Sequence, residues 1–148
     1  MEGATVIRRL DHVAIAVEKI QDRLPFYTDV LGLRLAGIEE VPGEKVRVAI
    51  LGEGSGRIEL LEAVGPDSPV ARFVDDRGEG IHHLCFLVDS LEETCRRLEG
   101  AGLRLVGGIR SGSERSRIAF LHPRDAGGIL IELRQEGEPP KESEGRGP

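Results

Sequence analysis

The sequence of 148 residues predicts an α+β fold built from two copies of one βαβββ unit, related by a pseudo-twofold axis. The segment GLRL occurs at residues 32–35 and again at 102–105, an offset of 102 − 32 = 70. RVAIL at 47–51 returns as RIAFL at 117–121, and 117 − 47 is also 70. Each copy carries a histidine on its first predicted strand and a glutamate on its last, at corresponding positions. These residues are His12 and Glu59 in the first copy, and His83 and Glu132 in the second.

The elements of the first copy follow from residue periodicity. Residues 10–17 alternate and are rich in β-branched side chains, which predicts a strand. Residues 18–31 carry apolar side chains at helical spacing and precede Gly32, a typical residue after the end of a helix. Residues 33–41, 46–51 and 57–63 are predicted strands, and the glycine-rich segment 52–56 is a predicted turn.

The second copy repeats this order after a connector. Ser68 and Pro69 predict the N-cap and the first residue of a short helix over 69–76. Residues 81–89 form a predicted strand, and Ser90 caps a helix that runs to about residue 100. The remaining predicted strands are residues 103–106, 117–121 and 129–134.

The predicted organisation is a single domain over residues 1–135. Its first module spans about 8–63, its connector 64–79 and its second module about 80–135. About 70 residues per copy is marginal for an independent core, so the two modules are expected to share one. Residues 136–148 contain no apolar side chain and are predicted to be a disordered tail.

Composition excludes several classes of protein. The net charge of −6 argues against a nucleic-acid surface, which requires a basic patch. No apolar stretch is long enough to cross a membrane, and residues 1–10 lack the apolar core of a signal peptide. Cys85 and Cys95 are expected to be free thiols in a cytoplasmic protein.

Strand alternation predicts which side chains share a face. His12 should lie on the face opposite Val13, Ile15 and Val17, whose branched side chains pack on the helices. The same argument turns Glu59, His83 and Glu132 to the open, concave side of the sheet. It places Asp11 and His82 on the other face.

Two imidazoles and two carboxylates at equivalent repeat positions indicate a site for a divalent metal ion. One strand glutamate alone is more often solvated, and one strand histidine alone is more often a hydrogen-bonded core residue. Four such residues on one face favour the metal site. The residue types suit several ions and do not select one.

Several motifs resemble those of the vicinal oxygen chelate superfamily, which includes glyoxalases, extradiol dioxygenases and bleomycin resistance proteins. Within it, the chain is most similar to the methylmalonyl-CoA epimerase family. The similarity runs from about residue 10 to residue 133. It rests on DHVAIAV at 11–17, FYTDVLG at 26–32, PDSP at 66–69, GEGIHH at 78–83, FLHP at 120–123 and GGILIEL at 127–133.

The resemblance implies a curved, partly open mixed β-sheet barrel with the helices outside. It implies that His12, Glu59, His83 and Glu132 hold one divalent ion. Co²⁺ or Mn²⁺ is favoured, and Zn²⁺, Ni²⁺ or Mg²⁺ would also fit this set of ligands. The implied reaction is epimerisation of methylmalonyl-CoA by removal of the proton between the thioester and the carboxylate, with the enolate stabilised by the metal ion.

The resemblance makes Glu132 the candidate base. Inversion requires a second catalytic group on the opposite face of the substrate, and Glu44 is the candidate, because Gly43 occupies the position of the usual family glutamate. A second departure is residues 111–116, which replace a glycine-rich family loop. The segments at residues 42–45 and 111–116 are both expected to line the substrate side of the site.

Three alternative functions use the same fold. Glyoxalase I (lactoylglutathione lyase) has the same metal ligands, a drug-binding resistance protein usually lacks them, and a ring-cleaving dioxygenase usually has one glutamate ligand fewer. The expected partners are an acyl-CoA thioester and a second copy of the chain in a homodimer, with neither nucleic acid nor membrane.

Overall fold

The computed structural model describes residues 7–137 of the chain, so nearly all of the predicted tail lies outside the described residues. The elements of the first half of the chain are β1 (Ile7–Val17), α1 (Ile20–Pro25), the π-helical turn η1 (Phe26–Val30), β2 (Leu35–Val41), the 3-10 turn η2 (Pro42–Glu44), β3 (Val46–Leu51) and β4 (Arg57–Ala63). Those of the second half are α2 (Pro69–Arg77), β5 (Gly80–Val88), α3 (Leu91–Gly100), β6 (Leu105–Ser111), η3 (Ser113–Arg115), β7 (Arg117–Leu121), η4 (Pro123–Ala126) and β8 (Leu130–Gln135).

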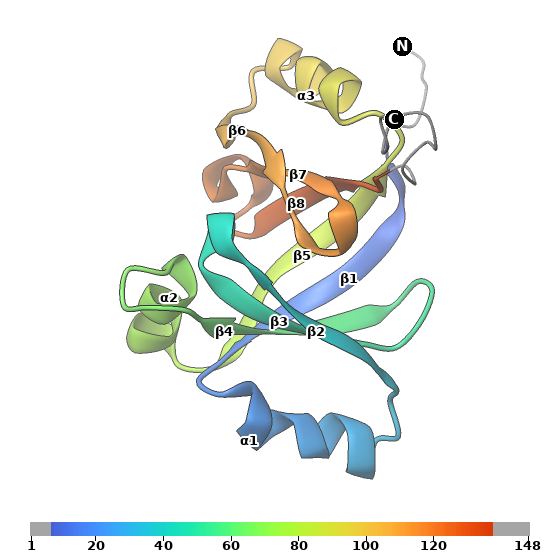
Figure 1. The fold of residues 1–148 in the computed structure, drawn as a ribbon. Helices are drawn as coiled ribbons and strands as arrows, with labels where there is room; N and C mark the ends of the chain where they lie inside the picture. The colour runs from blue at the N-terminus through green and yellow to red at the C-terminus, as the bar shows by residue number, and fades with distance from the viewer. Residues whose placement is uncertain (1–6, 138–148) are drawn as a thin grey trace, which may run out of the picture.

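The eight strands form one mixed sheet in the order β2-β3-β4-β1-β5-β8-β7-β6. The central strands β1 and β5 run antiparallel. β4 lies parallel to β1 on one side, and β8 lies parallel to β5 on the other. The two halves of the sheet therefore have the same strand order counted outward from the centre, which confirms the predicted pseudo-twofold α+β fold (Figure 1).

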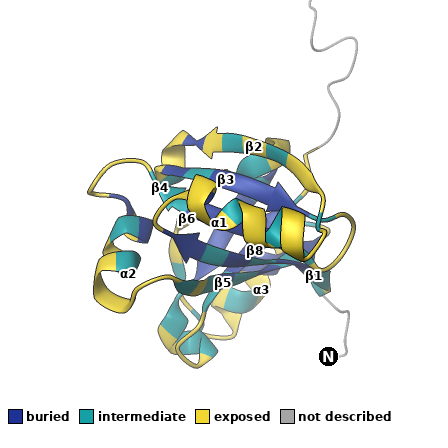
Figure 2. Ribbon diagram, turned by 90° about the horizontal axis from the view of Figure 1, so that it is seen from below, coloured by how far each residue is buried: buried dark blue, intermediate teal, exposed yellow. Residues whose placement is uncertain are grey.

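Helices α1 and α3 cover the outer face of the two halves, at the bottom and the top of Figure 1. Ile20 of α1 packs in a buried cluster with Leu51 and Leu60. Leu91 of α3 packs in a second cluster with Val88 and Leu133. Burying one leucine of this kind stabilises the fold by about 1.5–3 kcal/mol. In Figure 2, the strands behind α1 are largely buried, whereas the surface of α1 that faces the viewer is exposed.

The inner face of the sheet has a separate apolar cluster. Its small members Ala14 and Ala16 come from β1, and Val48 and Leu61 come from β3 and β4. Helix α2 packs against this cluster through Val70, so it covers part of the inner face. Ser68 is the N-cap of α2, as predicted, and its Oγ accepts a hydrogen bond of 3.1 Å from the Val70 N–H.

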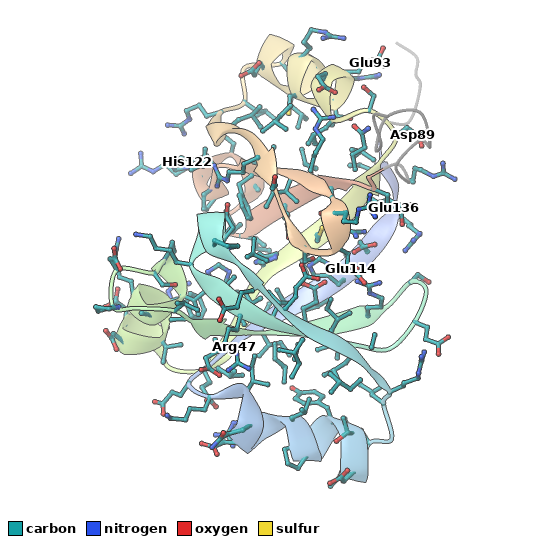
Figure 3. All side chains as sticks on the ribbon, viewed as in Figure 1. Arg47, Asp89, Glu93, Glu114, His122 and Glu136 are labelled. Atoms are coloured by element: carbon teal, nitrogen blue, oxygen red, sulfur yellow. The ribbon has the colours of Figure 1, made fainter. Side chains whose placement is uncertain are left out.

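The two edge strands of the sheet, β2 and β6, approach each other through the short turns η2 and η3. Arg110 of β6 donates from Nε to Oε2 of Glu44 over 2.7 Å. The backbone N–H of Glu114 donates to the carboxylate of Glu39 over 3.1 Å. Figure 3 shows Glu114 on the turn between β6 and β7. These contacts link the two edges of the sheet.

Within residues 7–137, no helix is long and apolar enough to cross a membrane.

Candidate metal and catalytic centre

The predicted ligand residues come from four strands that are consecutive in the sheet, β4, β1, β5 and β8. In the register, Ala14 of β1 lies between Glu59 and His83, and Cys85 of β5 lies between His12 and Glu132. All four residues are buried, with exposed fractions of 2% for His12, 3% for Glu59, 5% for His83 and 7% for Glu132. The centre of the sheet thus holds two imidazoles and two carboxylates away from water.

Three of these residues converge. Oε1 of Glu132 lies 2.8 Å from Nε2 of His83 and 3.5 Å from Nε2 of His12. One ligand atom from each of the three lies within 4.8 Å of the others. Both Nε2 atoms are buried, and neither has a hydrogen-bond partner among residues 7–137. Buried nitrogens without partners are costly, and two imidazoles with one carboxylate are a usual ligand set for a divalent cation, so these residues fit a metal ion.

Glu59 lies beside this group. Its Oε2 is 3.3 Å from Nδ1 of His12, on the side of the ring away from Nε2, and 3.5 Å from Nη2 of Arg57. It is not one of the three described residues whose ligand atoms cluster within 4.8 Å. The structure therefore puts Glu59 next to His12, and its place as the fourth ligand stays a prediction.

The charges of this centre are strongly coupled. Burial opposes the charged form of His12, but the hydrogen bond to Asp11 and the nearby carboxylates of Glu132 and Glu59 outweigh it and raise its pKa from 6.5 to about 9. Burial likewise opposes the anion of Glu132, but the neighbouring His83 and His12 lower the pKa of that carboxyl. Burial raises the pKa of Glu59. Without a metal ion, the centre is thus a buried ion pair of His12 and Glu132.

A pocket opens over this centre on the inner face, and Glu59, His83 and Glu132 line it. Gly112 and Ser113 line it too, so the segment at 111–116 reaches the pocket, as expected. The apolar lining residues are Val41, Val46, Val48, Leu61, Pro69, Val70, Ile118 and Phe120. A polar floor with apolar walls is a typical small-molecule site.

Glu44, the predicted second catalytic group, also lines this pocket. It ends η2, directly before Lys45, whose left-handed backbone (φ 57°) turns the chain into β3. Its ion pair with Arg110 leaves the Glu44 side chain 20% exposed. The structure thus brings Glu44 and Glu132 to one cavity, and no contact in the structure assigns Glu44 a role.

Two residues were placed wrongly by strand alternation. Asp11 was predicted on the opposite face from His12, but Oδ2 of Asp11 lies 2.8 Å from Nδ1 of His12. His82 was predicted on the opposite face from His83, but it lines the same pocket, and the two Nδ1 atoms are 2.9 Å apart. The reason is a register shift in the β1–β5 ladder at each residue, which interrupts the alternation. In the sequence, Asp11 and His82 each directly precede a predicted ligand histidine, and this equivalent position is the feature that could have indicated their location.

Comparisons with known proteins agree with this architecture. The family model described as "Glyoxalase/Bleomycin resistance protein/Dioxygenase superfamily" matches residues 9–133. A mitochondrial methylmalonyl-CoA epimerase from Mus musculus is 36% identical over 129 residues, which cover 86% of this chain and 72% of that protein. A lactoylglutathione lyase from Salmonella typhimurium is a weaker match, 32% identical over 133 residues, with coverage of 87% and 96%.

Solved structures give the same result. The crystal structure of methylmalonyl-CoA epimerase from Mycobacterium tuberculosis superposes with a TM-score of 0.88 and 38% identity, and the alignment covers 93% of this chain and 94% of that one. A Streptomyces coelicolor methylmalonyl-CoA epimerase in complex with 2-nitronate-propionyl-CoA has a TM-score of 0.86 and 31% identity, with coverage of 89% and 99%.

Proposed function

Because the chain belongs to the glyoxalase/bleomycin resistance protein/dioxygenase superfamily and, within it, to the methylmalonyl-CoA epimerase family, we propose that it interconverts (R)- and (S)-methylmalonyl-CoA. The observation that carries this proposal is the buried group of His12, His83 and Glu132 beneath a small, mostly apolar pocket. The pocket has apolar walls that suit the methyl group, and a polar floor that suits the carboxylate and thioester oxygens.

The proposed ligands of one divalent ion are His12, His83 and Glu132, with Glu59 as the fourth. Co²⁺ and Mn²⁺ remain the favoured ions. When bound, such an ion supplies a Lewis acid that stabilises negative charge on the substrate oxygens. Burial of all four side chains excludes water from the ligands and strengthens their electrostatic interactions.

Glu132 is the proposed base. His83 and His12 hold its carboxylate in the anionic form at neutral pH, so it can accept the proton from the carbon between the thioester and the carboxylate. The electron pair of the broken C–H bond moves into the thioester carbonyl and gives an enolate. Return of a proton to the other face of that carbon gives the opposite epimer.

Glu44 is the proposed group that exchanges a proton on the other face. It lines the same pocket as Glu132 but comes from η2, whereas Glu132 comes from β8. Nε of Arg110 donates a hydrogen bond of 2.7 Å to the Glu44 carboxylate and holds it in place. This pairing supports a fixed orientation for Glu44, which a proton transfer to carbon requires.

The proposal includes an acyl-CoA substrate, because the Streptomyces coelicolor relative binds an acyl-CoA analogue.

We also propose that the protein forms a homodimer and is cytoplasmic. The two cysteines are buried free thiols, which suits a reducing compartment. Sedimentation of the purified protein measures the oligomeric state, and a mass of one chain would remove the homodimer from the proposal.

Lactoylglutathione lyase is the second candidate, since a relative with that name matches most of this chain. Two incubations in deuterated water separate the candidates, one with methylmalonyl-CoA and one with the methylglyoxal–glutathione hemithioacetal. The proposal predicts deuterium at the α-carbon of methylmalonyl-CoA and no conversion of the hemithioacetal. Turnover of the hemithioacetal alone would reject it.

A further inference from the structure

The pairing of the two central strands has three register shifts, and two of them lie at equivalent places in the two halves. In β1, Leu10 pairs with Phe86 and His12 with Cys85, so Asp11 is an extra residue without a partner. In β5, His83 pairs with Ala14 and Ile81 with Ile15, so His82 is the extra residue. The two extra residues are 82 − 11 = 71 positions apart, the same offset as 83 − 12 for the histidines that follow them. Each is a β-bulge, which redirects a side chain and is common beside functional sites.

Each bulge brings the extra side chain to the Nδ1 atom of the next residue. Oδ2 of Asp11 lies 2.8 Å from Nδ1 of His12, and Nδ1 of His82 lies 2.9 Å from Nδ1 of His83. In a regular strand these neighbours would point to opposite faces and could not meet. In both His12 and His83, Nδ1 is thus in contact with the preceding residue. Their Nε2 atoms are buried, have no hydrogen-bond partner among the described residues, and lie near Oε1 of Glu132.

We infer that Asp11 and His82 are positioning residues, which hold Nδ1 of His12 and His83 so that both imidazoles present Nε2 to a metal ion. This inference rests on the metal site in the proposed function. The partner of one ring nitrogen decides which nitrogen is free to bind a metal, and a metal-binding histidine typically donates its other N–H to an acceptor. Asp11 can only accept, so Nδ1 of His12 carries the hydrogen. His82 accepts from Nδ1–H of His83.

The two positioning residues are themselves held in place. Asp11 is 2% exposed, and its Oδ1 lies 3.4 Å from Nη1 of Arg134, which is also buried. His82 packs edge-on against Phe73 of α2, with ring centroids 5.0 Å apart. Helix α2 therefore acts on His83 through His82, and β8 acts on His12 through Asp11.

The Asp11 carboxylate and the His82 imidazole differ in strength as hydrogen-bond acceptors. A carboxylate accepts a stronger hydrogen bond than a neutral imidazole, so it makes its histidine the more basic ligand. Loss of the Asp11 carboxylate should therefore weaken metal binding more than loss of the His82 acceptor.

The test is the affinity of the full-length protein for Co²⁺, measured by competition with a chelator. His82→Leu removes the acceptor but keeps an apolar side chain against Phe73, whereas His82→Asn offers an amide oxygen near the position of Nδ1. We expect a loss of about 10- to 100-fold for His82→Leu and recovery of most of it in His82→Asn. Asp11→Ala is expected to lose more Co²⁺ affinity than His82→Leu. Asp11→Asn keeps an acceptor for His12 and is the second variant to measure if Asp11→Ala does not fold. His122→Ala is the control, since this histidine caps η4 outside the pocket.

A second measurement is long-range ¹H–¹⁵N spectroscopy of the Zn²⁺-bound protein. Both ligand imidazoles should carry hydrogen on Nδ1, and the Nδ1 proton of His83 should exchange faster with water in His82→Leu. Equal affinities in His82→Leu and the wild type, equal losses in His82→Leu and His82→Asn, or hydrogen on Nε2 of His83 would overturn the inference alone. A wild-type protein that binds no Co²⁺ would overturn the proposed metal site and the inference with it.

Discussion

His12, Glu59, His83 and Glu132 lie on the inner side of the sheet, where simple strand alternation predicted them. Alternation worked because Glu59 and Glu132 lie between apolar residues of the clusters under α1 and α3, and each histidine is followed by an apolar residue. It failed at Asp11 and His82, because a bulge depends on how two strands pair and leaves no mark in the hydrophobic pattern of one strand. The side of the sheet on which these four residues lie could be predicted from the sequence, whereas the positions of the Asp11 and His82 side chains could not.

Replacing Glu132 by glutamine should remove the base with almost no change in size. We expect the rate of deuterium exchange into methylmalonyl-CoA to fall at least about 100-fold, because an amide cannot accept the α-proton. Circular dichroism and thermal unfolding check that the variant folds. Glu93→Gln, at an exposed glutamate in the first turn of α3, is the matched control (Figure 3). Full exchange activity in Glu132→Gln would mean that the base lies elsewhere.

The raised pKa of His12 predicts how the stability of the metal-free protein depends on pH. Its folded-state pKa of about 9 exceeds the ordinary 6.5, so protonation of His12 stabilises the folded state. This contribution is fully present below about pH 6.5 and is lost as the pH rises through about 9. Urea unfolding of chelator-treated protein should show declining stability over that window, and the decline should be weaker in His12→Gln. Identical slopes in the two proteins would contradict this prediction.

At the scale of elements, the boundaries of β3 and β4 are those predicted, because glycine-rich or polar turns flank both strands. The helix predicted over 18–31 begins at Ile20 and becomes π-helical after Pro25. Pro25 lacks the N–H of a regular helical hydrogen bond, and its effect on the helical geometry was not predicted. β6 was predicted to end at residue 106 but continues to Ser111, because the ladder resumes at Arg110 after a register shift across the glycines.

The N-cap of α2 allows a test of whether this helix supports the pocket. Ser68→Ala removes the hydrogen bond to the Val70 N–H and should cost about 1 kcal/mol of stability. Because Pro69 and Val70 line the pocket, we also expect a higher KM for methylmalonyl-CoA. Ser90→Ala removes the equivalent cap of α3, on the outer face, and should lower stability without raising KM. Equal KM values in the two variants would show that α2 does not shape the pocket.

At the scale of the whole molecule, the internal repeat predicted the symmetric sheet, because two similar halves can share a core across one central strand pair. It could not predict how the sheet edges close. That closure depends on charged side chains far apart in sequence, and the repeat does not show which of them pair across the two halves. Glu114 accepts from Arg57 of β4 at 2.7 Å and from Arg134 of β8 at 3.3 Å, so it joins strands from both halves.

Loss of this bridge should destabilise the whole fold. Glu114→Ala leaves two largely buried guanidinium groups without their shared carboxylate, and we expect a loss of about 2 kcal/mol in the free energy of unfolding. Asp89→Ala breaks an exposed ion pair with Arg8 and serves as the control, with no measurable loss expected (Figure 3). Urea denaturation compares the two variants, and equal stabilities would exclude a role for Glu114 in joining the halves.

The proposed function depends on one divalent ion bound among His12, His83 and Glu132. Anomalous diffraction from a crystal of the protein with Co²⁺ measures the position of this ion directly. We expect a single strong cobalt peak within bonding distance of Nε2 of both histidines and of a Glu132 oxygen, and the same map shows whether Glu59 turns toward the ion as the fourth ligand. A fully loaded crystal whose cobalt lies anywhere else would contradict it.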